Sequence, residues 1–367
     1  MARGFSPLEV SLIQARQFLL RATGTAAAAT NPSAAIVHLG YVQMDPIDVC
    51  GKMHDLILRN RIAGYRRDGL LESLYESMPR DFFEHYIPQR GILVAMPVSE
   101  YRFIVRAMRH RRNREGYGGA LEPSQQQLAR VILRRIKDEG PLGAAAFQNA
   151  ERSETGWGTS GSLAKTTLDK LFYHGRLLVS RREKFRRIFD LPERILPPEV
   201  FKARPATPRD ELRWLVMERL RQRRLVRLSA AQRSLVGDAI QPVCVNGAGV
   251  LYCLKEDVAL FDEPPREIPP MLLAPLDPIV YDRVVTRSIW DFDYTWEVYT
   301  PQTKRVRGYY ALPLLAGGVI VGHVDPRAER STDTLVARTN VLDENLVYPA
   351  LRKLADFLGL STVRIER

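Results

Sequence analysis

Apolar residues recur at helical spacing in the first part of the chain. They predict one helix over residues 6–22, with Ser6-Pro7-Leu8-Glu9 as its capping box, and a second from Asn31-Pro32 to Gly40. Because Pro46 disfavours a helical conformation at the residue before it, we expect Tyr41 to Asp45 to be extended or in a turn. Residues 66–110 follow as a mainly helical region, with breaks at three prolines: Pro79, Pro88 and Pro97.

The pattern between residues 124 and 198 predicts a winged-helix module. A helix over 124–139 precedes a short helix near 144–150 and a third helix over 160–174, and residues 177–189 then alternate like a β-hairpin around a basic turn. In this order of elements the third helix enters the major groove of DNA and the hairpin lies on the backbone. An ordinary helical bundle with a surface hairpin is the alternative interpretation.

The remaining pattern favours an α+β fold of tandem winged-helix modules with a small β-rich domain at the C-terminal end. Residues 207–262 repeat the outline in shortened form, with a helix up to Arg224 and a hairpin that turns at Asn246-Gly247. Proline pairs between 264 and 270 mark a linker. Predicted strands follow at 296–299, 307–312, 319–324 and 336–341, with a final helix over 344–358. The expected modules are 1–120, 121–200, 201–265 and 266–367.

The excess of basic residues predicts a polyanionic partner. The 367 residues include 54 Lys and Arg against 42 Asp and Glu, a formal net charge of +12. Basic residues concentrate in three segments, 106–114, 176–187 and 219–227, which favours nucleic acid as the partner. Solvated arginine-rich helices are the plainer alternative. Hydrophobic residues make up 45% of the chain, which excludes a disordered protein.

Several other classes of protein and site are excluded. No apolar run is long enough to span a bilayer, no secretory signal is visible, and three scattered cysteines build neither a disulfide framework nor a zinc site. A cytoplasmic protein is therefore expected. Gly156 to Gly161 matches a dinucleotide-binding pattern, but no buried strand precedes it, so we interpret it as the loop before the third helix. With no P-loop, HExxH or GxSxG motif, no nucleotide, metal or other cofactor is expected.

One short segment carries candidate chemistry. Gln43 and Asp45 lie two residues apart on the predicted extended segment, so their side chains point the same way and together could hold one water molecule. A purely structural role is the alternative, with Asp45 as a turn carboxylate before Pro46 and Gln43 as an amide that caps the backbone. Such a triplet arises by chance on the order of once in a chain of this length, so the pattern alone does not decide between them.

The segment Leu39-Gly40-Tyr41-Val42-Gln43-Met44-Asp45 resembles the LGYVQID signature of the bacterial YcaQ/AlkX family, which is related to the AlkZ-like proteins that carry QxQ instead. Lys52 and His54 lie where that family has Arg-Ala-His, and Pro88 replaces a histidine of its FEYWxH stretch. Further matches run along residues 7–360: Phe83-Glu84, Trp157-Gly158, Gly175, Arg182, Phe185, Asp190 to Arg194, Leu276-Asp277-Pro278, Asp282-Arg283, Phe292-Asp293-Tyr294, Gly308 to Leu315 and Gly322 to Asp325.

The resemblance implies a monofunctional DNA glycosylase that hydrolyses the N-glycosidic bond of N7-alkylated purines and unhooks interstrand crosslinks. It implies tandem winged helices around a concave basic channel, Gln43 and Asp45 as the catalytic pair, and double-stranded DNA with alkylated or crosslinked guanine as the partner of a monomer in the bacterial cytosol or nucleoid. A positive channel would help to keep Asp45 ionised. The predicted DNA-binding residues are Lys52, His54, Lys165, Lys170, Arg181, Arg182, Lys184 and Arg186. A non-catalytic winged-helix DNA-binding protein or transcriptional regulator is the alternative.

Overall fold

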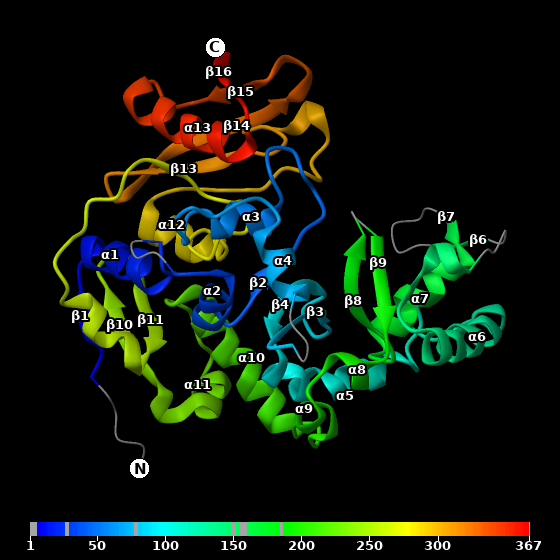
Figure 1. The fold of residues 1–367 in the computed structure, drawn as a ribbon. Helices are drawn as coiled ribbons and strands as arrows, with labels where there is room; N and C mark the ends of the chain where they lie inside the picture. The colour runs from blue at the N-terminus through cyan, green and yellow to red at the C-terminus, as the bar shows by residue number, and fades with distance from the viewer. Residues whose placement is uncertain are drawn as a thin grey trace. The chain divides into compact units, whose positions relative to one another are not determined.

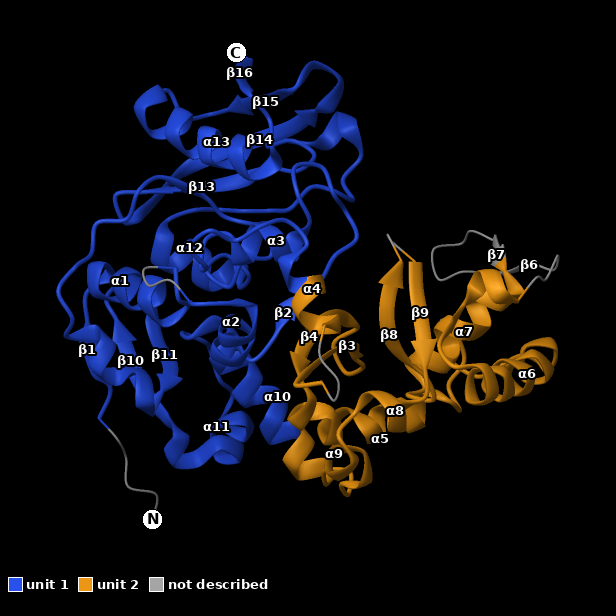
Figure 2. Cartoon of the chain, in the orientation of Figure 1, with its two compact units in different colours: residues 1–70, 212–367 blue, residues 71–211 orange. Residues whose placement is uncertain are grey.

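The computed structural model describes residues 6–25, 29–76, 80–116, 118–147, 152–154, 160–183 and 186–366. The chain divides into two compact units: the first is residues 1–70 with 212–367, and the second is residues 71–211 (Figure 2). Each unit mixes helices with small sheets, as the α+β class requires (Figure 1). The division into four modules stays a prediction. Across the described residues, no helix has both the length and the apolar content to cross a membrane.

The first unit begins with a strand where helical spacing predicts a helix. Leu8–Val10 forms β1, and α1 runs only from Leu12 to Ala22. The capping box is made by Ser11 and Gln14 rather than by Ser6 and Glu9. The start of the prediction is wrong because β1 pairs in parallel with β10 (Ile240–Val245), a partner that local periodicity cannot reveal.

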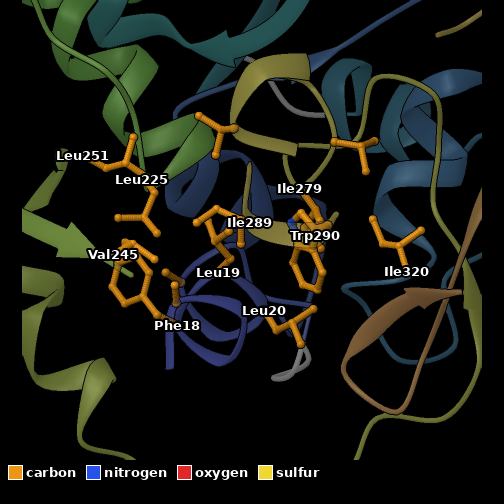
Figure 3. Packing of buried hydrophobic residues seen from close by; sticks show 14 of the residues in the cluster. Phe18, Leu19, Leu20, Leu225, Val245, Leu251, Ile279, Ile289, Trp290 and Ile320 are labelled. Atoms are coloured by element: carbon orange, nitrogen blue, oxygen red, sulfur yellow. The ribbon is translucent and has the colours of Figure 1, made fainter. Parts of the chain in front are cut away.

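The core of the first unit joins residues from both ends of the chain (Figure 3). Phe18 of α1 stacks on Phe261, with 4.0 Å between the ring centroids. Ile289 and Trp290 come from α12 (Arg283–Trp290), a helix that the sequence pattern does not predict. β11 (Gly249–Leu254) pairs with β10 in antiparallel register across the predicted turn, which confirms that hairpin.

A five-stranded sheet completes the first unit. Its order is β12-β13-β14-β15-β16, with β15 and β16 parallel and the other pairs antiparallel. The strands are β12 (Met271–Leu272), β13 (Leu312–Ala316), β14 (Val319–Glu329), β15 (Thr334–Thr339) and β16 (Thr362–Glu366). The predicted terminal helix is α13 (Glu344–Leu358). Trp296–Tyr299 is not a strand, because carboxylates hold this part of the chain as a loop, as described below.

The second unit contains the helices and hairpin predicted as a winged helix. Its elements are α4 (Gly69–Tyr75, which begins at the end of the first unit), β3 (Phe82–Ile87), β4 (Ile92–Pro97), α5 (Tyr101–Arg111), α6 (Pro123–Glu139), β5 (Leu142–Gly143), β6 (Arg152–Glu154), β7 (Ser160–Ser162), α7 (Leu163–Tyr173), β8 (Leu178–Glu183), β9 (Arg186–Asp190), α8 (Pro192–Ile195) and α9 (Pro198–Lys202). The predicted short helix is a single 3₁₀ turn, Ala144–Ala146. Residues 156–159 of the glycine-rich motif lie outside the described residues. The tandem winged-helix arrangement and its channel stay predictions.

The predicted helical region 66–110 contains a β-hairpin. β3 and β4 pair in antiparallel register and turn at Gly91, whose φ of 67° favours glycine. Aromatic and β-branched residues dominate β3, and they fill the pleated surface of a sheet better than a helix face; β4 is apolar throughout. The helical prediction is therefore wrong between the two proline breaks Pro79 and Pro97, and right for α4 and α5 on either side.

Candidate functional site

The segment that carries Gln43 is held by a close approach to helix α10 (Pro208–Arg223). α2 (Pro32–Leu39) is capped by Asn31 and ends at Gly40, where φ is 79°. A Cβ at Gly40 would collide with the buried carboxylate of Glu218, so only glycine fits this turn. Gln222 donates a hydrogen bond of 2.8 Å to the backbone oxygen of Tyr41. Two independent contacts thus fix where β2 (Val42–Gln43) starts.

Burial alternates along this segment as the sequence predicts. Val42 and Met44 are buried, whereas Gln43 and Asp45 keep partial exposure. The side-chain oxygen of Gln43 is buried and accepts no hydrogen bond from any described residue. A buried acceptor without a partner is costly, so its natural partner is a group that enters the site, such as water.

Asp45 is a desolvated carboxylate. Burial raises its pKa, and a 2.9 Å hydrogen bond from the Ile47 amide to Oδ1 partly offsets the rise. A structural role for Asp45, as a turn carboxylate before Pro46, was the alternative interpretation of the sequence. This hydrogen bond is the contact expected for that role, so Asp45 does cap the turn. The pKa shift is upward, opposite to the one that a positive channel would produce. A raised pKa makes the ionised carboxylate a stronger base than an exposed aspartate.

Three aromatic side chains belong to the surroundings of Asp45. Tyr299 and Tyr310 lie within electrostatic range of its carboxylate, and Trp296 contacts both tyrosines. Burial raises the pKa of Tyr310 well above its usual range, with the charge of Asp45 adding to the rise, and burial and Asp45 raise that of Tyr299. Trp296 packs edge-on against both tyrosine rings, at 5.8 and 6.0 Å between centroids. The Tyr310 hydroxyl and the Trp296 indole N–H are buried without a hydrogen-bond partner among the described residues.

Two carboxylates shape the loop that carries these rings. Glu297 accepts hydrogen bonds from the amides of Val306, Arg307 and Gly308. Asp325 accepts from the amides of Tyr309 and Tyr310, at 3.2 and 2.8 Å. The sequence predicts strands at 296–299 and 307–312 and marks Gly308 to Leu315 as a motif of the resemblance, so neither Tyr299 nor Tyr310 was predicted as a site residue. The sequence signal for Tyr310 was the pair of tyrosines beside a glycine, Gly308-Tyr309-Tyr310.

Lys52 and His54 belong to an internal polar cluster. The Lys52 ammonium forms an ion pair with Asp68, and His54 is only 3% exposed. Asp55 accepts a 2.7 Å hydrogen bond from the Tyr65 hydroxyl, and burial raises its pKa to about 6. His54, Asp55 and Asp68 have metal-ligand spacing, but the Lys52 ammonium already neutralises Asp68. DNA contact by Lys52 and His54 stays a prediction, and this burial does not favour it.

The predicted DNA-binding residues of the second unit separate into exposed and structural groups. Lys165 on α7 and Arg186 on β9 are exposed, and Arg181 is exposed beside Glu183. Lys170 donates to the backbone oxygen of Ala120 at 2.9 Å and to Gln125 at 2.7 Å, so it ties α7 to α6. Lys184 lies outside the described residues.

Arg182 is held by a buried carboxylate. Glu84 of β3 accepts hydrogen bonds from Arg182 at 2.6 Å and from Arg187 at 3.2 Å. Glu84 is 1% exposed; burial raises its pKa, but the two arginines outweigh burial and the net shift is downward. The network fixes the β8–β9 hairpin on β3, which leaves Arg181 and Arg186 as the described wing cations available to a phosphate.

A family model for AlkZ-like DNA glycosylases matches residues 36–358, a range that includes the Gln43 segment, the hairpin of the second unit and the C-terminal sheet. This chain belongs to the AlkZ-like DNA glycosylase family. The fold is also similar to that of Streptomyces sahachiroi DNA glycosylase AlkZ, with a TM-score of 0.61 over 98% of this chain and 100% of that chain, at 15% identity. The predicted resemblance is confirmed, and the family makes the chain a DNA glycosylase rather than a non-catalytic regulator.

This AlkZ-like glycosylase has a basic cavity that the sequence only partly indicates. It has a volume of about 760 Å³ and lies in the second unit between α5, α6 and the end of α7. One acid, Glu193, lines it against five cations: Arg109, Arg112, Arg134, Lys137 and Arg176. None of these cations forms an ion pair within the described residues. Burial and the charges of Arg176 and Arg109 lower the pKa of Arg112, as expected of a surface that lacks its anion.

The third basic segment of the glycosylase is mainly structural. Arg224 is buried and bonds Asp257 at 2.9 Å, Arg221 bonds Glu218 at 2.8 Å, and Arg219 bonds the backbone oxygen of Arg227 at 3.0 Å. The run of arginines over 219–227 predicted a contact with a polyanion. In the structure, much of its charge is instead neutralised by partners inside the first unit.

Proposed function

We propose that this glycosylase hydrolyses the N-glycosidic bond of N7-alkylated purines in double-stranded DNA, including the unhooking of interstrand crosslinks. The observation that carries the proposal is the unpartnered, buried acceptor of Gln43 two residues from the desolvated carboxylate of Asp45. The pair offers a water molecule one hydrogen-bond acceptor and one base.

The chemistry of the substrate requires little else. Alkylation at N7 puts a positive charge on guanine, which weakens the glycosidic bond, and the base departs neutral without a general acid. The sugar develops oxocarbenium character, as in glycoside hydrolysis. Ionised Asp45 stabilises that charge and accepts a proton from the attacking water, while Gln43 orients the water. The product is an abasic site, because no lysine is assigned as a nucleophile.

Nearby aromatic rings provide a surface on which a nucleobase can stack in this site. Tyr299 is 67% exposed and Trp296 packs against it, so a purine has a ring to stack on beside Asp45. The phenol of Tyr310 and the indole of Trp296 provide donors without partners among the described residues. A crosslinked base stays tethered to the opposite strand and cannot be freely flipped. An open, basic channel would suit such a substrate, and in this proposal Arg181, Arg186 and Lys165 bind its phosphates.

Single-turnover excision of N7-methylguanine tests the two roles. Asp45→Asn keeps the shape but loses charge and basicity, so the rate of the chemical step should fall by about 10²–10⁴-fold. Gln43→Ala loses only the group that orients the water, so the rate of the chemical step should fall by about tenfold. Affinity for lesion-free DNA should stay at the parent value in both variants.

The same assay with a nitrogen-mustard crosslink tests the substrate class. The parent should release alkali-labile abasic sites from both substrates, without strand cleavage before alkali. Excision by Asp45→Asn at the parent rate, or a far larger loss in Gln43→Ala, would refute the assigned roles. Excision of monoadducts without unhooking would refute the crosslink activity alone.

A further inference from the structure

A second cavity lies in the first unit, beside α3 (Met53–Leu58) and α13. Its volume is about 250 Å³. The residues that line it are Arg59, Asn60, Tyr65, Met271, Ala350, Lys353 and Phe357. No carboxylate is among these described residues, which include two cationic side chains.

Arg59 is a cation for which the described part of the chain supplies no counter-ion. It is half-buried, its Nε atom is buried without a hydrogen-bond partner, and its guanidinium makes no ion pair with any described residue. Its contact is the ring of Phe357, 5.7 Å away. Burial lowers the pKa of Arg59 to about 10, so it stays protonated at neutral pH. A shielded cation that no anion compensates costs stability unless a ligand supplies the charge.

Neighbouring groups do not neutralise Arg59. Burial raises the pKa of the Cys50 thiol above its usual range, so that thiol is neutral. The Asn60 amide is engaged with the backbone oxygen of Leu272 at 2.9 Å, and the Tyr65 hydroxyl donates to Asp55. Lys353 is exposed and also lacks an ion pair among the described residues. Tyr65 and Phe357 stack at 6.3 Å and form an apolar wall.

We propose that this cavity binds a phosphate group, with the Arg59 guanidinium as its inner ligand and the Lys353 ammonium as its outer ligand. A guanidinium binds tetrahedral oxyanions through two parallel N–H donors, and a lysine adds a mobile point charge. The small volume suits a single phosphate group better than a large ligand. The phosphate comes either from free inorganic phosphate or from the DNA backbone, and neither source depends on the roles of Gln43 and Asp45.

Calorimetric titration of the full-length protein with inorganic phosphate, at constant ionic strength, tests the site. The parent should bind one phosphate saturably. Arg59→Met should weaken binding at least about tenfold, and Lys353→Met by a few fold, because the first loses charge-assisted hydrogen bonds and the second an exposed charge. Arg330→Met is the matched control, since Arg330 is exposed on the same unit outside the cavity, and its affinity should equal that of the parent.

Thermal unfolding separates ligand binding from a structural role. Phosphate should raise the Tm of the parent and not that of Arg59→Met. Without phosphate, Arg59→Met should melt at or above the parent Tm, because it removes an uncompensated charge; a structural arginine would give a lower Tm. The absence of saturable binding by the parent, or an equal loss in Arg330→Met, overturns the proposal. Lys353 is exposed, so Lys353→Met provides the same test of phosphate binding if Arg59→Met does not fold.

Binding to lesion-free duplex DNA identifies the source of the phosphate. If the DNA backbone occupies the cavity, inorganic phosphate competes with DNA and Arg59→Met flattens the salt dependence of DNA binding by about 0.9 log units. If the ligand is free phosphate, DNA binding is the same in the parent and in Arg59→Met. Excision of N7-methylguanine is measured separately, so failure of the glycosylase chemistry and failure of this site give different results.

Discussion

At the scale of single residues, the candidate site combines polar groups whose hydrogen-bonding capacity is incompletely used. Gln43, Trp296 and Tyr310 each keep a buried polar atom without a partner among the described residues, and Asp45 is partly stripped of water. Such groups destabilise the folded chain, and they concentrate where a substrate later supplies the partner. The pKa of Asp45 therefore bears on both stability and catalysis.

We expect Asp45→Asn to raise the Tm at neutral pH. The folded pKa of Asp45 lies above its unfolded value, so the folded state binds more protons between the two values and stability rises as the pH falls. The gain of the variant over the parent should therefore disappear as the pH falls through the raised pKa. Thermal melts of both proteins across the acid range measure it, and an Asp45→Asn Tm below that of the parent at neutral pH would contradict the prediction.

Excision by the parent should follow the same ionisation. The rate should decline as the pH falls through the pKa of Asp45, at a higher pH than an exposed aspartate would give. Gln43→Ala should keep this acid limb, because it retains the base. A rate that is independent of pH across that range would show that Asp45 is not the base.

At the scale of elements, the hairpin of the second unit is held by a buried charge. Glu84 forms ion pairs with both Arg182 and Arg187, so the basic residues of β8 and β9 are not equivalent. Removing one partner of a buried ion pair leaves the other charge buried and uncompensated, which destabilises the fold. Replacing exposed cations mainly alters the interaction with phosphates.

Glu84→Gln should destabilise the second unit by about 3–5 kcal/mol, because it leaves Arg182 without a carboxylate and Arg187 with only Asp169, at 3.6 Å. Hydrogen exchange of the β8–β9 segment and urea unfolding measure the loss. Glu183→Gln is the control, since that carboxylate is exposed beside Arg181 and should change stability by less than about 1 kcal/mol. Equal effects of the two substitutions would show that the buried network is not what holds the hairpin.

The double variant Arg181→Gln and Arg186→Gln should bind all DNA sequences more weakly to a similar degree. Its salt dependence should flatten by about 0.9 log units for each phosphate that the variant no longer neutralises. The matched control is Arg338→Gln with Arg364→Gln, two exposed arginines on β15 and β16 of the first unit, whose slope should equal that of the parent. An unchanged slope in the wing variant would mean that the wing is only solvated surface.

At the scale of the whole molecule, the second unit is one continuous stretch of chain inserted between two stretches that build the first. The second unit has its own core, with Ile132, Leu168, Phe172 and Phe189 among its buried residues. The core of the first unit needs Phe18 and Leu19 from the start of the chain together with Ile289 and Trp290. The two units therefore depend on different parts of the sequence.

Residues 71–211 alone should fold and unfold cooperatively, because the apolar cluster around Phe172 is made only of residues from this unit. The full chain without residues 1–22 should lose the structure of the first unit, since both β1 and the buried face of α1 are then missing. Circular dichroism and thermal melts of the two fragments provide the measurement. An unfolded 71–211 fragment would show that its core depends on the rest of the chain.

The sequence by itself determined the elements whose signals are local. Asn31 and Gly40 bound α2, Asn246-Gly247 sets the turn of β10 and β11, and helical spacing gives α6 and α13. It also predicted the extended stretch from Tyr41 to Asp45, because the effect of Pro46 on the residue before it needs no distant partner. These features depend on backbone conformation over a few residues. The family resemblance, not this local pattern, marked Gln43 and Asp45 as a candidate catalytic pair.

Only the tertiary structure decided which polar residues are free to act. Lys170 and Arg182 have the same side-chain chemistry as ligand-binding residues, but partners elsewhere in the chain enclose them: Gln125 and Glu84. His54 is likewise buried, with 3% of its surface exposed. β1 likewise became a strand through pairing with β10, against the helical spacing of its own sequence. Whether a cation meets DNA or a buried carboxylate, and whether an apolar repeat becomes helix or strand, depends on interactions between residues far apart in the chain, and periodicity in one segment does not encode those interactions.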